Sequence, residues 1–161
     1  MSYGIVRVQK FSSGSVKGIE IHDRREKEGV SHTNKDIDWS KTDQNYDLHP
    51  AQNSSFQKAV KNRISQLRLP KAVRKDAVVM AQVLVTSDYE FFEWMPPQEI
   101  QKFFSDSYDF LAKRYGTENI ISATVHLDER TPHMHFNFVP VTTDGRLSAK
   151  DILTRKNLID Q

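Results

Sequence analysis

The 161-residue sequence predicts an α+β fold, in which helices pack on one antiparallel or mixed sheet. Short apolar or alternating stretches, typical of strands, occur at residues 3–10, 77–86, 120–127 and 134–141. Longer stretches with an apolar residue every three or four positions, typical of amphipathic helices, lie between them. Strands that are separated by helices and end in a hairpin favour a single sheet with helices packed on it.

The first strand is expected at residues 3–10, where apolar and polar side chains alternate. Residues 12–14 end it, and a helix is expected over residues 15–28, before a glycine. On such a helix His22 and Arg25 lie three positions apart on one face. This pair suits phosphate chemistry, because a guanidinium binds phosphate and an imidazole can attack or carry a proton. By itself the pair is a weak signal, since it occurs by chance in many helices.

Residues 31–50 are rich in Asn, Asp, Ser and Thr, and we expect them to form a loop. A loop of this length inside a compact domain favours a binding function. Ser54 is expected to cap a helix with an apolar stripe over residues 56–67, which Pro70 ends. Residues 77–86 are apolar at nearly every position, which predicts a central strand covered on both faces.

A long helix is expected after Pro96-Pro97, and Gly116 marks its C-terminal end. The aromatic residues on its apolar stripe favour a role in the core over a stacking platform. Asp144-Gly145 indicates a turn near the C-terminus, and a last helix is expected from Asp151. The sequence contains no internal repeat.

The stretch from His126 to His135 holds three of the six histidines. The residues around them favour two strands joined by a polar turn at residues 128–132. His133 and His135 are two positions apart, so their side chains lie on one face of a strand. A hairpin would bring His126 beside them and place Glu129 at the rim of the cluster.

Three neutral imidazoles on a rigid sheet can hold a divalent metal and leave coordination positions open, as a catalytic metal requires. The alternative is that these are ordinary histidines on a solvated strand face. Three histidines on one face beside a carboxylate favour the metal site. On affinity alone, imidazole ligands would suit Zn²⁺, Ni²⁺ or Co²⁺ better than harder ions.

The composition excludes several classes of protein. The chain has no cysteine, which removes disulfides and thiolate metal sites and is compatible with the cytoplasm. There is no apolar run of membrane-spanning length. Residues 48–75 contain no acidic residue but seven basic ones, whereas residues 88–109 carry six acids. The basic segment is either a solvated helix face or a surface that contacts a phosphate backbone.

The pattern from His126 to His135 closely resembles the third motif of the MobV-type plasmid mobilisation relaxases, the Pre/Mob family. These are HUH endonucleases, named for two histidines that flank a hydrophobic residue, here His133-Met134-His135. The resemblance covers nearly the whole chain. Other segments similar to family landmarks, in family order, are residues 1–3, 22–25, 33–37, 45–48, 74–78, 86–88, 115–116 and 145–148.

The resemblance implies a central five-stranded antiparallel sheet flanked by helices. It also implies site- and strand-specific nicking of DNA at a plasmid origin of transfer, followed by rejoining of the strand. The enzyme would bind a DNA hairpin and flanking single strand, and no small-molecule substrate. Residues 1–161 would form the catalytic domain and be the N-terminal fragment of a longer bacterial cytoplasmic protein. A homodimer could form through the absent C-terminal region.

The resemblance also assigns roles to single residues. His126, His133 and His135 match the metal ligands, with Mn²⁺ favoured and Mg²⁺ as the second choice. Glu129 matches an acidic residue near the metal, as fourth ligand, orienting group or base. His22 takes the place of the nucleophile, beside Arg25 as a phosphate-binding residue. The expected DNA contacts are Tyr46, Tyr115, Asn34, Lys58, Lys61, Arg63, Arg74, Lys75 and Lys150.

Two other classes of function share these features. A replication initiator or a transposase of the HUH type would use the same metal site with a tyrosine nucleophile. A DNA-binding module without catalysis would carry the histidines for structural reasons only. Loss of a covalent DNA adduct on replacing His22, but not Tyr46, distinguishes the relaxase from both.

Overall fold

The computed structural model describes residues 4–26, 36–49 and 54–154. In chain order the elements are β1 (Gly4–Ser12), α1 (Ser13–Asp23), the 3-10 helix η1 (Trp39–Gln44), β2 (Tyr46–Asp47), α2 (Phe56–Ser65), β3 (Val78–Ser87), α3 (Tyr89–Glu93), α4 (Pro97–Tyr115), the 3-10 helix η2 (Thr117–Asn119), β4 (Ile120–His126), β5 (His133–Phe138) and α5 (Ala149–Ile152). None of the helices in this part of the chain is long and apolar enough to cross a membrane.

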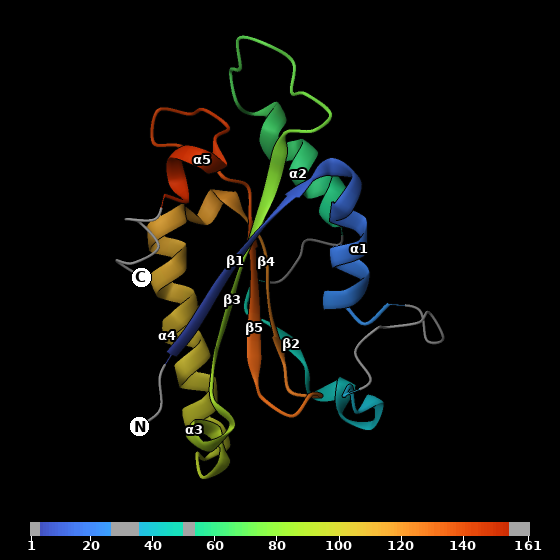
Figure 1. Ribbon diagram of the computed structural model, residues 1–161, viewed down its shortest axis with the longest axis vertical. Helices are drawn as coiled ribbons and strands as arrows, with labels where there is room; N and C mark the ends of the chain where they lie inside the picture. The colour runs from blue at the N-terminus through green and yellow to red at the C-terminus, as the bar shows by residue number, and fades with distance from the viewer. Residues whose placement is uncertain (1–3, 27–35, 50–53, 155–161) are drawn as a thin grey trace.

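The strands form one five-stranded sheet in the order β1-β3-β5-β4-β2, and every neighbouring pair is antiparallel. Figure 1 shows the sheet between two helical layers, with α1 and α2 on one side and α3, α4 and α5 on the other. The predicted five-stranded antiparallel sheet flanked by helices is confirmed.

The two faces of the sheet differ in chemistry because side chains alternate along each strand. On β5, Met134, Phe136 and Phe138 face α4 and are fully buried in the larger apolar core. Their neighbours His133, His135 and Asn137 face the α1–α2 layer. A second, smaller apolar core under α1 and α2 covers only part of this face. The remaining polar part of the face holds the histidines.

Helix α1 begins and ends earlier than the sequence indicated. It ends at Asp23, and the chain turns because the Arg25 N–H donates to the His22 carbonyl and the Glu26 N–H to the Ile21 carbonyl. These two bonds form a Schellman motif, whose left-handed position is usually a glycine. Here Arg25 occupies it, with φ 51°. The expectation that His22 and Arg25 share a helical face is therefore wrong.

The expected loop at residues 31–50 contains structure in its described part, residues 36–49. Asp38 caps η1 by accepting a hydrogen bond from the Ser40 N–H. The two residues of β2 then pair with Thr124 and Val125 of β4 at the edge of the sheet. The Asp47 carboxylate accepts from the Ala123 N–H at 3.0 Å and fixes this pairing. A two-residue strand is too short to produce an alternating pattern in the sequence.

The N-terminal cap of helix α2 is Ser55, one residue later than the Ser54 that the sequence indicated.

Candidate metal and catalytic site

The histidine hairpin has the predicted geometry. His133 lies opposite His126 across β4 and β5, and His135 lies two positions further along the same face. The ring centroids are 5.1 Å apart for His126–His133, 4.7 Å for His126–His135 and 4.9 Å for His133–His135. Glu129 lies in the turn, with Oε1 3.6 Å from His133 Nε2. The three-imidazole cluster with a carboxylate at its rim is thus present.

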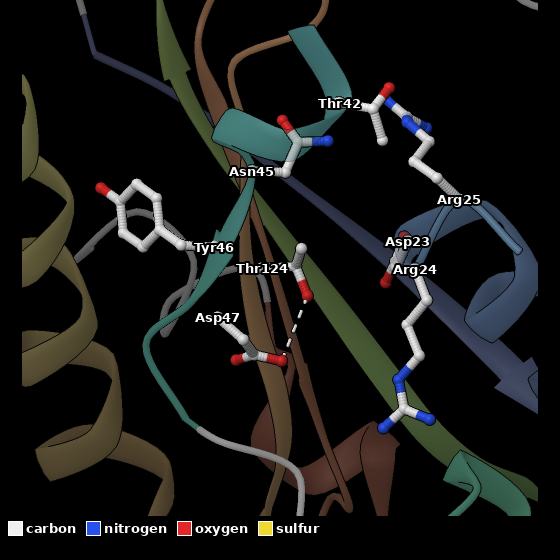
Figure 2. A pocket seen from close by; sticks show the side chains of 8 residues that line it. All are labelled: Asp23, Arg24, Arg25, Thr42, Asn45, Tyr46, Asp47 and Thr124. Atoms are coloured by element: carbon white, nitrogen blue, oxygen red, sulfur yellow. Dashed lines mark hydrogen bonds between the residues drawn. The ribbon is translucent and has the colours of Figure 1, made fainter. Parts of the chain in front are cut away.

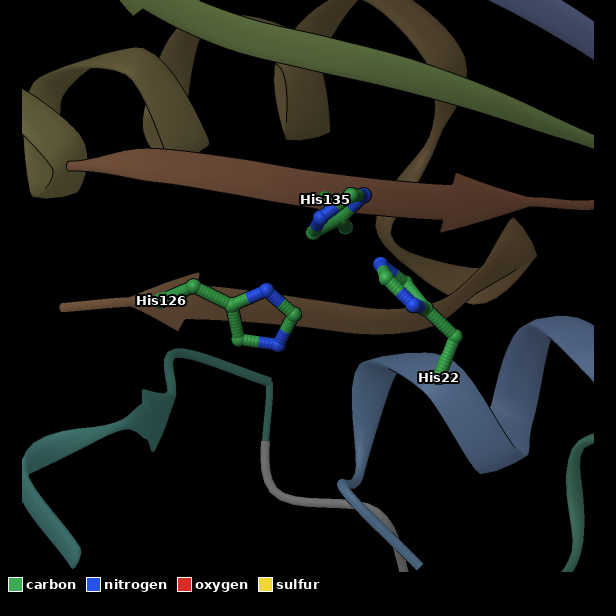
Figure 3. A group of neighbouring side chains, drawn as sticks. All are labelled: His22, His126 and His135. Atoms are coloured by element: carbon green, nitrogen blue, oxygen red, sulfur yellow. The ribbon is translucent and has the colours of Figure 1, made fainter. Parts of the chain in front are cut away.

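His22, from the last turn of α1, points into the same cluster (Figure 3). Its ring centroid lies 5.9 Å from that of His126 and 5.5 Å from that of His135. Nitrogen atoms of these three rings lie within 4.8 Å of one another. The same holds for ligand atoms of His126, Glu129 and His133. The structure therefore brings the expected nucleophile and the expected metal ligands together around His126.

The rings of two histidines are oriented by carbonyl oxygens of the backbone. His133 Nδ1 lies 2.9 Å from the Thr131 carbonyl, and His126 Nε2 lies 2.7 Å from the Asp23 carbonyl. A carbonyl oxygen only accepts, so these nitrogens carry the ring protons. The lone pairs of neutral rings are then at His133 Nε2 and His126 Nδ1, which are 3.2 Å apart. Metal-binding histidines commonly donate their other N–H in this way.

A divalent cation fits this set of side chains. The lone pairs of His126 Nδ1 and His133 Nε2 face each other at 3.2 Å, an arrangement that a cation bound by both rings would stabilise, and Arg25 lies 3.2 Å from the first of these atoms. His135 Nε2 is buried and has no hydrogen-bond partner among residues 4–26, 36–49 and 54–154. Three imidazoles with the Glu129 carboxylate form a mixed nitrogen and oxygen ligand set, and the carboxylate oxygen suits Mn²⁺ or Mg²⁺ better than imidazole alone.

Burial keeps two of the rings neutral at pH 7. Burial, with the charge of Arg25 second, lowers the pKa of His126 to about 3. Burial and the neighbouring imidazoles hold the pKa of His135 well below its usual range. Neutral imidazoles are the form that binds a metal, so these two rings need not lose a proton on binding.

Arg25 is held by an acidic pair from the hairpin turn. Its Nε and one terminal nitrogen donate to the two oxygens of Asp128, each at 2.9 Å, and the same terminal nitrogen donates to Glu129 at 2.6 Å. That nitrogen also lies 3.2 Å from His126 Nδ1. The Arg25 side chain is 2% exposed and that of Asp128 is fully buried. Arg25 thus ties the end of α1 to the turn that carries Glu129.

Asp128 is a residue that sequence reasoning missed, since it was only one polar position in the turn. Besides Arg25, Thr42 Oγ1 and Asn45 Nδ2 donate to its Oδ2, at 3.0 and 2.9 Å. Burial alone would raise its pKa, but hydrogen bonds from Arg25 and Asn45 hold the pKa below the usual range. Figure 2 shows Thr42, Asn45 and Arg25 among the residues that line a cavity of about 420 Å³.

A second cavity, of about 490 Å³, lies on the open side of the site. It is lined by three histidines, His22, His133 and His135, and by Glu129. The strands β1 and β3 supply the other wall, and Arg7 and Arg130 add positive charge at its rim. Arg25 does not line this cavity, in contrast to the expectation that it contacts a phosphate beside His22.

The two tyrosines expected to contact DNA lie on the other face of the sheet. Tyr115 is 6% exposed and stacks on Phe138 in the larger core, with centroids 4.1 Å apart. Tyr46 packs against the same core, and its buried hydroxyl has no hydrogen-bond partner within the described part of the chain. The structure does not bring either ring to the histidines. Asn34 lies outside the described residues.

The expected basic contacts are distributed over several surfaces. Lys58 and Lys61 are exposed on α2, in the helical layer on the histidine side of the sheet. Arg74 and Lys75 are exposed in the segment before β3 and, with Lys61, line a cavity of about 560 Å³. Arg63 instead donates to Asn119 Oδ1 at 2.7 Å. Lys150 is exposed on α5, in the opposite layer.

The titrating groups under the site predict a stability maximum for the metal-free protein near pH 6.5. Burial, against a hydrogen bond from Asn137, raises the pKa of Asp23 to about 8. The unfolded chain binds two more protons, on His126 and His135, as pH falls below about 6.5, so stability is lost there. Asp23 has the opposite effect on stability: between about pH 4 and 8 its proton is bound only in the folded state, so its contribution to stability decreases as pH rises.

Below about pH 6.5 stability therefore rises with pH, and the lowered pKa of His49 adds to this rise. Above it, the Asp23 proton makes stability fall by up to about 1.4 kcal/mol per pH unit. Urea unfolding in the presence of a chelator, from pH 5 to 8, measures it. Asp23→Asn should remove the decline above pH 6.5. A stability that rises steadily up to pH 8 in the unaltered chain would contradict the raised pKa of Asp23.

The whole chain, residues 1–161, matches the Mob_Pre family, whose description is plasmid recombination enzyme. A plasmid recombination enzyme type 2 of Staphylococcus aureus is 45% identical over 160 residues, which are 99% of this chain and 37% of that enzyme. A plasmid recombination enzyme of Bacillus thuringiensis is 42% identical over 98% of this chain and 35% of its own length. The chain thus spans little more than a third of these relatives.

Solved structures of a MobM relaxase domain share the fold. In one, the domain is bound to 22 nucleotides of plasmid pMV158 oriT DNA with a 3′ thiophosphate, in a Mn-bound crystal at pH 6.8. It superposes with a TM-score of 0.90 and 37% identity, over 97% of this chain and 79% of that one. A second Mn-bound complex, at pH 5.5, gives a TM-score of 0.88 and 36% identity over the same shares. On both sequence and structure, the chain belongs to the Mob_Pre family of plasmid recombination enzymes.

Proposed function

We propose that the chain is the catalytic part of a relaxase, a metal-dependent enzyme that nicks and rejoins one DNA strand at a plasmid origin of transfer. The observation that carries this proposal is the convergence of His22 with His126, His133 and His135 on one face of the sheet, where all but the buried His126 line one cavity. The Mn-bound complexes of the MobM relaxase domain with oriT DNA support it.

The proposed metal ligands are His126, His133 and His135, with Glu129 as a fourth ligand or an orienting group. A bound Mn²⁺, or Mg²⁺ as the second choice, would polarise a non-bridging oxygen of the scissile phosphate. The carbonyls of Thr131 and Asp23 orient the rings of His133 and His126 in advance, so little reorganisation accompanies metal binding.

His22 is the proposed nucleophile. A neutral ring nitrogen of His22 forms a bond to phosphorus, while the bond between phosphorus and the 3′ oxygen breaks. The 3′ oxygen takes up a proton and the other ring nitrogen of His22 releases one. The 5′ phosphate stays on the protein as a phosphoramidate, and attack by a 3′ hydroxyl reverses the step and rejoins the strand.

Arg25 is better suited to positioning than to direct contact with the phosphate. Both oxygens of Asp128 and one of Glu129 hold its guanidinium, and another of its nitrogens donates to the His22 carbonyl at 3.0 Å. The side chain thereby connects the residue that would attack with the turn that carries Glu129. Its charge also disfavours protonation of the nearby His126.

A covalent adduct tests the proposed function. The chain is incubated with Mn²⁺ and either a single-stranded oligonucleotide of the pMV158 origin or a randomised single-stranded pool. We expect a protein–DNA band that survives denaturation and disappears with a chelator. The relaxase proposal fails if neither substrate gives a band. A band of equal yield after complete chelation would contradict the role of the metal, and a metal-free preparation excludes a contaminating nuclease.

The exposed lysines of α2 are proposed to contact the DNA backbone. Lys58→Ala with Lys61→Ala should weaken binding of single-stranded DNA and lower the slope of log affinity against log salt by about 0.7 per lost phosphate contact. Fluorescence anisotropy at about 50 to 300 mM salt measures the affinity and its salt dependence. The matched control replaces Lys102 and Lys113 of α4, in the opposite layer, by alanine. Equal slopes for the two double variants would place the DNA elsewhere.

A further inference from the structure

A row of buried polar side chains crosses the sheet beside the histidines. Gln82 of β3 lies opposite Asn137 of β5, which lies opposite Ser122 of β4. Gln82 is 6% exposed, and the other two are fully buried. Asp23, at the end of α1, covers the row and is 1% exposed. Four polar residues in such a place require a reason beyond the packing of the core.

The row begins at the Asp23 carboxyl. Its Oδ2 acts as the acceptor when the carboxyl is ionised or carries its proton on Oδ1, the oxygen that lies 3.7 Å from His135 Nδ1. The Asp23 Oδ2 atom accepts from Asn137 Nδ2 at 2.7 Å and from Gln82 Nε2 at 3.4 Å. With its NH₂ group toward Asp23 and toward Ser122 Oγ, Asn137 directs its carbonyl oxygen at Gln82 Nε2, 2.9 Å away. Turning either amide over would place oxygen against oxygen or NH₂ against NH₂. The neighbours therefore fix the orientation of both amides.

The remaining end of the row meets a histidine. With its NH₂ group committed to Asn137 and Asp23, Gln82 presents Oε1 to His135 Nδ1 at 3.1 Å. An amide oxygen only accepts, so His135 Nδ1 carries the ring proton. The lone pair is then on Nε2, which is the buried atom without a hydrogen-bond partner among the described residues. His133 and His126 obtain the same type of orientation from backbone carbonyls.

We propose that Gln82, oriented by Asn137 and Asp23, is a positioning residue that keeps His135 as its Nδ1–H tautomer and so presents the Nε2 lone pair to a divalent cation. The inference rests on the proposed role of His135 as a metal ligand. Backbone carbonyls cannot be removed by substitution, so His135 is the ligand whose orientation depends on a replaceable side chain.

The tautomer itself is measurable without metal. Long-range ¹H–¹⁵N correlation spectra of histidine-labelled, chelator-treated protein distinguish Nδ1–H from Nε2–H rings, and His135→Ala identifies the signals. We expect the Nδ1–H form in the unaltered chain and a shift toward Nε2–H in Gln82→Met, which keeps the length but removes the acceptor. The control Thr124→Val changes the residue opposite His135 on β4 and should leave the tautomer unchanged. An Nε2–H ring or an equal mixture in the unaltered chain overturns the inference, whether or not any variant folds.

Metal affinity provides the second measurement. Electron paramagnetic resonance of free Mn²⁺ should show an affinity about 10- to 100-fold lower for Gln82→Met. An affinity within about threefold in Gln82→Met, with the tautomer unchanged, contradicts the proposal. Failure of the relaxase proposal is distinguishable, because the unaltered chain would then show the Nδ1–H ring but no binding of Mn²⁺ or no DNA adduct.

Discussion

His22→Ala is expected to abolish the covalent DNA adduct and to lower the rate of nicking by at least about 10³-fold. The reason is that the variant lacks the ring nitrogen that would form the bond to phosphorus, while the cavity and the other three imidazoles stay in place. Adduct yield on a denaturing gel measures it. The adduct of the unaltered chain should be labile in acid, as a phosphoramidate is and a phosphotyrosine is not.

Two controls separate attack from other roles of His22. Tyr46→Phe removes a hydroxyl on the opposite face of the sheet and should form the adduct normally. His22 also lies within ligand distance of His126 and His135, so the affinity for Mn²⁺ must be compared. We expect His22→Ala to bind Mn²⁺ within about threefold of the unaltered chain and His126→Ala to bind it at least about tenfold more weakly. Equal losses in the two variants would make His22 a ligand and not the nucleophile.

Asp128→Ala is expected to lower the free energy of unfolding at pH 7 by about 3–5 kcal/mol. It leaves Arg25 buried without its bidentate partner, and it removes the acceptor of Thr42 and Asn45. The folded-state pKa of Asp128 is depressed, so its contribution is present above the unfolded pKa of about 4 and is lost as pH falls below it. Urea unfolding of the chelated protein at pH 7 measures the difference.

The matched control is Asp144→Ala, which breaks an exposed pair with Arg146. It should change the free energy of unfolding by less than about 1 kcal/mol. The difference between the two aspartates should shrink at acid pH, as Asp128 becomes protonated. If Asp128→Ala is no more destabilising than Asp144→Ala at pH 7, the ion pair with Arg25 does not hold the site together.

Features that depend on short-range periodicity could be predicted from the sequence. The two-residue spacing of His133 and His135 places them on one face of a strand, and the turn after His126 predicts a hairpin. The histidine cluster could therefore be predicted from the ten residues from His126 to His135. The strands other than β2 and the long helix α4 followed from the pattern of apolar positions. The same repeat also placed Tyr115 on the buried stripe of α4, and the structure buries it.

Features set by distant contacts were not predictable in this way. The side chain of Arg25 is held by Asp128, 103 positions later, and nothing in the sequence pairs these two residues. The strand β2 exists because Asp47 binds the backbone of β4. Gln82 lies in a strand that is apolar at nearly every position, so a single polar residue there produces no alternating pattern that would indicate its role. Its proposed role depends on its neighbours on β5 and α1, which are distant in the sequence.

The left-handed backbone at Arg25 places one position under two opposing demands. Glycine would relieve about 1–2 kcal/mol of local strain there, whereas only arginine supplies the buried fork that Asp128 and Glu129 bind. Replacing Arg25 by glycine therefore loses the stability that the guanidinium contributes, but it regains part of that free energy by relieving the backbone strain. The stability of an Arg25→Gly chain consequently understates the damage to the site, and variants at this position are to be ranked by metal and DNA binding, not by melting temperature.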